Sequence, residues 1–244
     1  MNRTERHHLK ENEIETLARE AREAFQTRGR ETMIGVVAIV VIGALAAGYY
    51  GWREHVQTKA HGLLAEAMTV QDARIGPPPA PGTPANGLYF PTERERAQAA
   101  LTKFKIAADA YPSTDAGIYA RYQEGATSLA LGTPTGAAEA FQQVIASNAN
   151  GFYGQMAKLG LAEAQMGSGQ ADKAIDTFKE LAQHKDGPLP VDGILMQLGR
   201  LYVDAGKTAD AQQTFNRLVD EYPESPFSGE ARKVLETLKK SSTI

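Results

Sequence analysis

Cysteine is absent from the 244-residue sequence, which excludes disulfides, thiolate metal sites and cysteine nucleophiles. This absence does not fix the compartment, because cysteine-free proteins are tolerated in reducing and oxidising surroundings alike. An excess of one charge is also missing. The net charge is -3, so no basic field would attract nucleic acid, and we predict no nucleic-acid partner.

Motifs that carry chemistry are missing too. The sequence has no phosphate-binding glycine loop, nucleophile elbow or zinc signature. His7 and His8 are adjacent and would point to different faces of a helix, which makes them a poor metal pair. The other histidines have no partner at a ligand spacing: His55, His61 and His184. We therefore predict a non-enzymatic protein with no catalytic residues, cofactor or metal site.

Long apolar runs are rare, with one exception at residues 33–52, MIGVVAIVVIGALAAGYYGW, which carry no charge. A helix of this length covers about 30 Å, the thickness of a bilayer's hydrocarbon core. A cleaved signal peptide has a short charged start, whereas 32 mostly polar residues come first here. A buried core helix is a third reading, but the run has no polar face. We predict a transmembrane helix in contact with lipid, with interfacial aromatics at its end: Tyr49, Tyr50 and Trp52.

The flanking charges predict an orientation for this helix. Residues 13–32 hold four Lys or Arg and residues 53–72 hold two. The positive-inside rule then favours a cytoplasmic N-terminus and an exported C-terminal part. In a bacterium this corresponds to a single-pass protein of the inner membrane with most of its chain in the periplasm.

Two segments flank the regular part of the chain. Residues 1–32 form a charged arm with apolar residues at helical spacing, which we interpret either as a solvated helix or as a cytoplasmic docking helix. Residues 53–75 are expected to be a helix. Residues 76–91 contain six prolines and must form a loop, either a simple insert or a proline-rich ligand.

The rest of the chain repeats with a period of 37 residues, which indicates stacked supersecondary units. Helices are expected at 92–110, 115–131, 134–148, 152–166, 170–184, 190–204, 208–221 and 227–240. The segment 92–112 completes a first pair, 113–225 forms three repeats, and 226–244 is a capping helix and tail. The recurring residues are Ala100, Ala137, Ala174 and Ala211; Phe104, Phe141, Phe178 and Phe215; Gly132, Gly169 and Gly206; and the small Gly125, Ala162 and Gly199.

The last unit resembles the tetratricopeptide pattern. Counted from Asp192, the positions 8, 15, 20, 24 and 32 are Gly199, Gly206, Ala211, Phe215 and Pro223. Small residues allow the two helices of a pair to approach, and the phenylalanine fills the gap to the next pair. We predict an all-α protein in which one transmembrane helix precedes a solenoid of about four helix pairs and a capping helix. The usual early aromatic is missing, since Arg121, Lys158 and Leu195 stand there, and the period exceeds the usual 34.

The resemblance also implies a partner-binding groove on the first helices of the pairs. Its residues would be Tyr119, Tyr122, Leu129, Met156, Leu159, Glu163, Met166, Met196, Arg200 and Val203. Methionine is flexible, so such a groove suits varied apolar partners. The alternative is that these side chains only pack one first helix against the next.

The layout as a whole looks like the ancillary SecYEG translocon subunit (YfgM-like) family. That resemblance implies SecYEG, a membrane-anchored prolyl isomerase and exported client chains as partners. Residues 222–233 also resemble repeats of an outer-membrane assembly lipoprotein and of a Tol-associated division coordinator. A homo-oligomer paired through the anchor is a further alternative, based on small residues four apart: Gly43 with Ala47, and Ala44 with Gly48.

Overall fold

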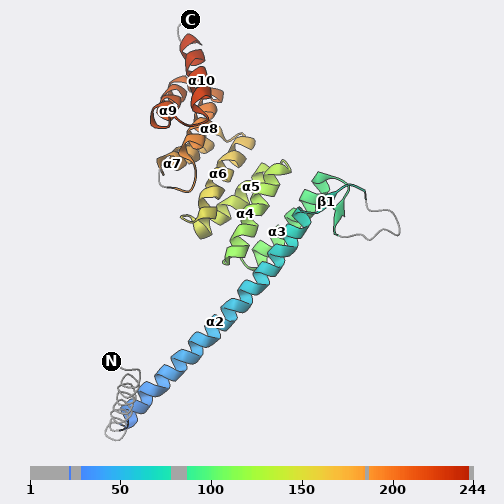
Figure 1. Ribbon diagram of the computed structural model, residues 1–244, viewed down its shortest axis with the longest axis vertical. Coiled ribbons are helices and arrows are strands. Elements are labelled where there is room, and N and C mark those ends of the chain that lie inside the picture. Colours follow the sequence, from blue (N-terminus) through green and yellow to red (C-terminus); the bar gives the residue numbers. More distant parts are fainter. Residues whose placement is uncertain (1–21, 23–28, 78–86, 185–186, 242–244) are drawn as a thin grey trace, which may run out of the picture. The chain divides into compact units, whose positions relative to one another are not determined.

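The computed structural model describes residues 22, 29–77, 87–184 and 187–241 (Figure 1). The described chain is α-helical apart from one short pair of strands, which confirms the predicted all-α class. It divides into two units, residues 1–56 and residues 57–244. Most of the predicted arm, residues 1–21 and 23–28, lies outside the described residues, as does the pair His7–His8.

The first unit is dominated by helix α2, Gly29–Gln71, whose C-terminal part belongs to the second unit. The predicted anchor, residues 33–52, lies within this helix. From Met33 onward α2 is long and apolar enough to cross a membrane, with a mean hydropathy of 2.2 in its most apolar window. None of that window is buried inside the protein, and its large side chains face outward, as with Ile39 at 71 % and Leu45 at 69 % exposed. This exposure excludes the buried-core-helix reading.

The proline-rich insert is closed at its base by two short parallel strands, β1 (Arg74–Ile75) and β2 (Tyr89–Phe90). The amide of Gly76 donates to the carbonyl of Phe90 at 2.9 Å, next to the strand pair. The expectation of loop throughout 76–91 is therefore wrong at 89–90. The expected helix over 53–75 ends earlier, at Gln71, because Arg74 and Ile75 pair as a strand.

The second unit is a succession of antiparallel helices that follow one another along the chain (Figure 1). After residues 57–71 of α2 come α3 (Glu93–Ala110), α4 (Asp115–Ala130), α5 (Pro134–Asn148), α6 (Phe152–Gly167), α7 (Ala171–Gln183), α8 (Val191–Asp204), α9 (Thr208–Glu221) and α10 (Ser228–Ser241). The helices α4, α6 and α8 are the first helices of three pairs, and α5, α7 and α9 are the second helices. The expected helical-hairpin solenoid is confirmed.

The turns inside these pairs share one local geometry. Gly132, Gly169 and Gly206 have φ of +77°, +72° and +70°, a left-handed conformation that glycine adopts without steric cost. After each glycine, the next amide reaches back over the end of the first helix, as when Lys207 donates to the carbonyl of Tyr202 at 2.8 Å. This is the Schellman pattern, which satisfies carbonyls at a helix C-terminus. The recurring glycines therefore turn the chain from first to second helix.

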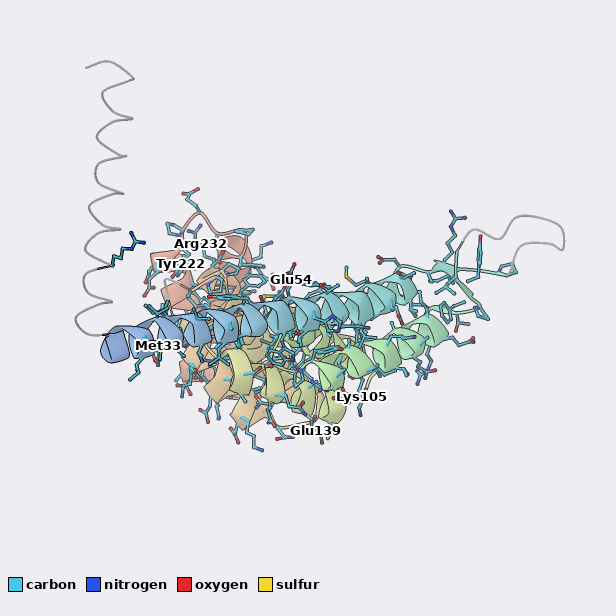
Figure 2. The ribbon with its side chains drawn as sticks, turned by 90° about the horizontal axis from the view of Figure 1, so that it is seen from below. Met33, Glu54, Lys105, Glu139, Tyr222 and Arg232 are labelled. Atoms are coloured by element: carbon cyan, nitrogen blue, oxygen red, sulfur yellow. The ribbon has the colours of Figure 1, made fainter. Side chains whose placement is uncertain are left out.

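The cores of the pairs lie around the recurring phenylalanines. Their exposed fractions are 0–1 %: Phe104, Phe141, Phe178 and Phe215. A Cβ atom on Gly199 would lie 2.6 Å from Cζ of Phe215, which real structures do not allow. Glycine at 199 is therefore what lets α8 approach α9 so closely. Outward-facing positions of α3 and α5 carry charged residues such as Lys105 and Glu139, which are exposed (Figure 2).

Arg121, Lys158 and Leu195 stand where the tetratricopeptide pattern has an early aromatic residue. The two basic residues form ion pairs with neighbouring helices, and the leucine packs in the core. Arg121 of α4 forms ion pairs with Asp109 of α3 and with Glu124. Lys158 of α6 contacts Glu180 of α7 at 2.5 Å. Leu195 is 1 % exposed, in the core. A polar residue is tolerated at this position because a neighbouring helix supplies its counter-charge.

Candidate protein-binding face

A hollow of about 190 Å³ opens between the first helices α6 and α8. Its lining is mostly apolar and comes from Leu159, Glu163, Leu189, Pro190, Gly193, Ile194, Met196, Gln197, Arg200 and Phe227. Pockets for small molecules usually have volumes of about 300–1,000 Å³. The hollow is smaller than this, so it suits one or two apolar side chains of a polypeptide better than a whole small molecule.

Gly193 keeps the hollow open. A Cβ atom at this position would lie 3.6 Å from Cε2 of Phe227 and 4.0 Å from Cγ of Pro190, which is ordinary van der Waals contact. A larger side chain is therefore tolerated by the backbone here and would extend into the space that the glycine leaves free. Pro190 precedes the first residue of α8, and its fixed φ suits a helix start.

Three tyrosines from the first helices α4 and α6 form the tyrosine cluster: Tyr119, Tyr122 and Tyr153. The ring centroids of Tyr119 and Tyr153 are 5.1 Å apart, and those of Tyr122 and Tyr153 are 5.9 Å apart. These distances are typical of favourable aromatic pairs. Phe152 contacts Tyr153 edge-on at 5.4 Å and is itself 56 % exposed. The cluster therefore offers ring surface that the fold does not fully cover.

Glu163 connects the hollow with Tyr122 of the tyrosine cluster. It lines the hollow, and its carboxylate is close enough to Tyr122 to help raise the pKa of that phenol, after burial, which is the larger cause. Although Glu163 is exposed on α6, desolvation by the surrounding protein raises the pKa of its carboxyl above the usual range. The hollow and the cluster are thus neighbouring parts of one surface, which we call the first-helix face.

The structure brings half of the predicted groove residues together. Tyr119 and Tyr122 belong to the tyrosine cluster, and Leu159, Glu163 and Arg200 line the hollow. Four others stand on the same helices but belong neither to the lining of the hollow nor to the tyrosine cluster. Of these, Met156 and Leu129 are partly buried, while Met166 is 39 % and Val203 38 % exposed.

Met196 departs from the expected groove. It is 1 % exposed and packs in the core with Leu195 and Leu198, so it forms only part of the floor of the hollow. The physical reason is that α8 packs against both α7 and α9, and that Phe227, just before α10, packs against the same core. Met196 thus packs between helices and also forms part of the floor of the hollow.

Several residues of the first-helix face were not predicted from the sequence. Tyr153 stands two residues before the unit boundary assumed at Gln155, so the repeat alignment left it out. Its helical spacing to Met156 and Ala157 is the signal that would have placed it on the same side of α6. Leu189, Pro190 and Phe227 lie outside the helices of the repeat, where a period gives no information.

A second hollow of about 210 Å³ lies at the other end of the second unit. It is lined by Gln71, Glu93, Arg96, Ala97, Ala100, Gln123, Ala126, Thr127 and Ala130, from α2, α3 and α4. Arg96 donates to the carbonyl of Ala73 at 3.3 Å and lies 3.8 Å from Glu93. The charged side chains that line this hollow, Arg96 and Glu93, thus contact each other. Over the described ranges, no group of three or more His, Cys, Asp or Glu side chains is placed to hold a metal ion.

Comparison with known proteins gives the following matches. A family model described as a tetratricopeptide repeat-like domain matches residues 113–234. A tetratricopeptide repeat protein from Parabacteroides merdae is similar in structure, with a TM-score of 0.51 and 15 % identity over 61 % of this chain and 56 % of that chain. The tetratricopeptide-like repeats of a putative kinesin light chain from Podosopora anserina give a TM-score of 0.56 at 13 % identity, over 77 % of this chain and 88 % of that chain.

The matched region spans just over half the length of the Parabacteroides protein. No curated protein sequence matches the chain. At these identities the structural likeness concerns the fold alone.

Proposed function

Because the chain belongs to the tetratricopeptide repeat-like domain family, we propose that it is a non-enzymatic scaffold that binds other proteins through its first-helix face. The observation that carries this proposal is the apolar hollow between α6 and α8 beside the partly exposed tyrosine cluster. Exposed apolar surface of this kind is typical of interaction sites. Aromatic and methionine side chains are also enriched where proteins contact one another.

A substitution that fills the hollow tests this proposal. Replacing Gly193 by leucine fills the hollow, while the helix gains a residue of better helix propensity. We expect Gly193→Leu to abolish capture of partner proteins from detergent extracts and to leave the melting temperature unchanged or higher. Gly136→Leu is the matched control, because a Cβ at Gly136 of α5 meets nothing within 4 Å. Equal capture by both variants would contradict the proposal.

We further propose that residues 33–52 anchor the protein in a membrane. The supporting observations are the length, the absence of charge and the outward exposure of this part of α2. A cleaved signal sequence has the same composition, so the test measures both location and mass. The anchored chain stays in the membrane fraction after alkaline extraction with its full mass, whereas a cleaved chain loses its N-terminal residues.

A substitution pair tests the anchor itself. Each arginine at the centre of a transmembrane helix costs about 2.5–3.5 kcal/mol of insertion free energy. Val41→Arg combined with Leu45→Arg is expected to move the protein to the soluble fraction. The apolar exchange of Val41→Leu with Leu45→Ile serves as the control and is expected to stay with the membrane.

The orientation we propose places the N-terminus in the cytoplasm and the repeats in the periplasm of a bacterium. The support is the distribution of Lys and Arg around the apolar segment. Since the chain lacks cysteine, a single introduced thiol is unique. In intact spheroplasts, a membrane-impermeant maleimide is expected to label Lys240→Cys and not Asn12→Cys. The opposite labelling pattern would refute this orientation.

The cellular role we propose is assistance to protein export beside the Sec translocon. The first-helix face would receive exported client chains, together with a membrane-anchored prolyl isomerase, before chaperones take them. The layout of anchor and repeats supports this role. After mild detergent extraction, SecYEG or the isomerase should co-purify with the protein. Recovery of outer-membrane assembly or Tol components instead, or of the chain alone as an oligomer, would refute it.

A further inference from the structure

Glu163 is an unusual feature of the first-helix face because its charge has no ion-pair partner in the described part of the chain. Among the residues that the structure describes, its carboxylate takes part in none of the hydrogen bonds or ion pairs observed. It is nevertheless partly desolvated, which is unfavourable for a carboxylate without a counter-charge. A group held in this way is stabilised when a cation arrives from outside.

The charged groups around Glu163 do not supply that cation. Arg200 is the cation among the residues lining the hollow, and its Nη2 lies 2.6 Å from Oε1 of Glu230 on α10. Lys158, on the same helix as Glu163, is paired with Glu180 of α7. Asp192 at the start of α8 accepts a hydrogen bond from Ser225 at 2.7 Å. Among the residues that the structure describes, no cation therefore compensates the negative charge of Glu163 at the edge of the hollow, and Asp192 adds a second carboxylate that only a hydroxyl contacts.

The aromatic neighbours of Glu163 favour the same kind of ligand. Tyr122 lies within electrostatic reach of the carboxylate, and its ring packs with those of Tyr153 and Phe141, at 5.9 Å and 5.8 Å between centroids. Ring faces attract ammonium and guanidinium groups. The apolar stem of a lysine or arginine can also lie along apolar surface while its charged end stays in a polar place.

We propose that the first-helix face selects polypeptide segments in which a lysine or arginine lies close to an apolar residue. The basic side chain sits between Glu163 and the tyrosine cluster, and the apolar side chain enters the hollow beside Gly193. This inference rests on the proposed protein-binding function and names the chemistry of its ligand. An acidic segment is disfavoured, because it would place a second negative charge next to Glu163.

The test uses the full chain in detergent micelles and three fluorescent synthetic peptides of the same length. Each peptide has leucines around one central position, which is lysine in the first, glutamine in the second and glutamate in the third. We expect the lysine peptide to bind roughly 1.5- to fivefold more tightly than the glutamine peptide, the range for an exposed charge pair. The glutamate peptide should bind most weakly.

Variants of Glu163 separate this inference from a general effect of charge. Glu163→Gln should remove the preference for lysine while keeping the affinity for the glutamine peptide. Glu163→Lys should reverse the preference toward the glutamate peptide, which a merely damaged fold would not do. Glu139→Gln is the matched control, since it removes an exposed glutamate from α5, and it should leave the preference unchanged.

The outcomes distinguish the two proposals. Equal binding of all three peptides to the wild-type chain, lost in Gly193→Leu, would overturn this inference and leave the protein-binding function in place. No binding of any peptide above that of micelles alone would overturn both. A lysine preference that persists in Glu163→Gln would also overturn the inference, because the charge would then act elsewhere.

Discussion

Phe141 of α5 occupies the space that a side chain on Gly160 of α6 would need. A Cβ atom built on Gly160 lies 2.6 Å from Cε2 of the phenylalanine ring. On its other side, a Cβ on Gly125 of α4 would lie 2.7 Å from Cε1 of the same ring. One phenylalanine is thus held between glycines of its own pair and of the next pair. This contact joins two successive units of the solenoid.

Gly160→Ala should therefore destabilise the protein. Overpacking of a core costs about 1–3 kcal/mol, while alanine in place of a helical glycine returns about 1 kcal/mol at most. Gly136→Ala is the control, with nothing within 4 Å of its new Cβ, and should stabilise α5. Urea unfolding of both variants measures the difference. A Gly160→Ala protein as stable as Gly136→Ala would show that the ring moves aside without cost.

The turn glycines predict a different pattern. Gly169 has φ of +72° and a Cβ there would meet nothing within 4 Å, so the cost of alanine comes from the backbone alone. That cost is about 1–2 kcal/mol for an ordinary residue in the left-handed region. Asparagine tolerates this region better, so Gly169→Asn should lose less stability than Gly169→Ala. Thermal unfolding of the two variants checks this order, and the reverse order would contradict the turn geometry.

The carboxyl of Glu163 makes a prediction about pH. Its pKa is raised in the folded protein by desolvation, so the folded state holds the proton to a higher pH than the unfolded state does. Stability is therefore lost as the pH rises from the unfolded pKa through the raised folded pKa. Glu163→Gln should raise the melting temperature at pH 7 and change it little at pH 3. An identical shift at both pH values would argue against desolvation as the cause.

An exposed ion pair links two successive units. Nζ of Lys207 lies 2.7 Å from Oδ1 of Asp172. The hydrogen bond with Lys207 and its charge lower the pKa of Asp172, and the hydrogen bond with Asp172 raises the pKa of Lys207. The stabilisation is present between the ordinary pKa values of the two groups. It is lost as the pH falls through the lowered pKa of Asp172, or rises through the raised pKa of Lys207.

A double-mutant cycle with Asp172→Asn and Lys207→Gln measures this pair. Both groups are exposed, so the coupling should be small and should disappear in 1 M salt, which screens surface charges. A partly buried hydrogen bond joins the same two units, because Arg217 donates to the carbonyl of Ala182 at 2.9 Å. It can be compared with the exposed pair of Lys207 and Asp172. A coupling unchanged by salt would mean that the two groups act through something other than charge.

The fold follows from the sequence wherever one residue type satisfies one local need in every unit. Phe178 and Phe215 recur because each pair has the same gap to fill, and Gly169 and Gly206 recur because each turn needs the same positive φ. These needs are local, so a period of 37 residues reveals them. Gly160 escapes the period, since glutamines stand 37 residues to either side of it at 123 and 197. Its close contact with Phe141 belongs to one junction only.

The binding face is less predictable because it depends on how different connections cover the helices. Residues 184–190 join α7 to α8, whereas the shorter 149–151 join α5 to α6. Leu189 and Pro190 therefore reach the hollow, with no counterpart at the earlier junction. Met196 is buried by α7, α9 and Phe227, although its position in the unit corresponds to Tyr122 and Leu159. A repeat pattern places a residue on a helix, but the neighbouring segments decide its exposure.

Crosslinking from the hollow tests the central claim most directly. Gln197 is exposed, lines the hollow and is a better position than the buried Met196. A photoreactive phenylalanine analogue is placed at Gln197 or, as control, at the exposed Glu139 of α5, and living cells are irradiated. The account predicts polypeptide adducts from position 197 that disappear when Gly193→Leu is added, and none from position 139. Adducts that survive Gly193→Leu, or equal adducts from both positions, would contradict a protein-binding face between α6 and α8.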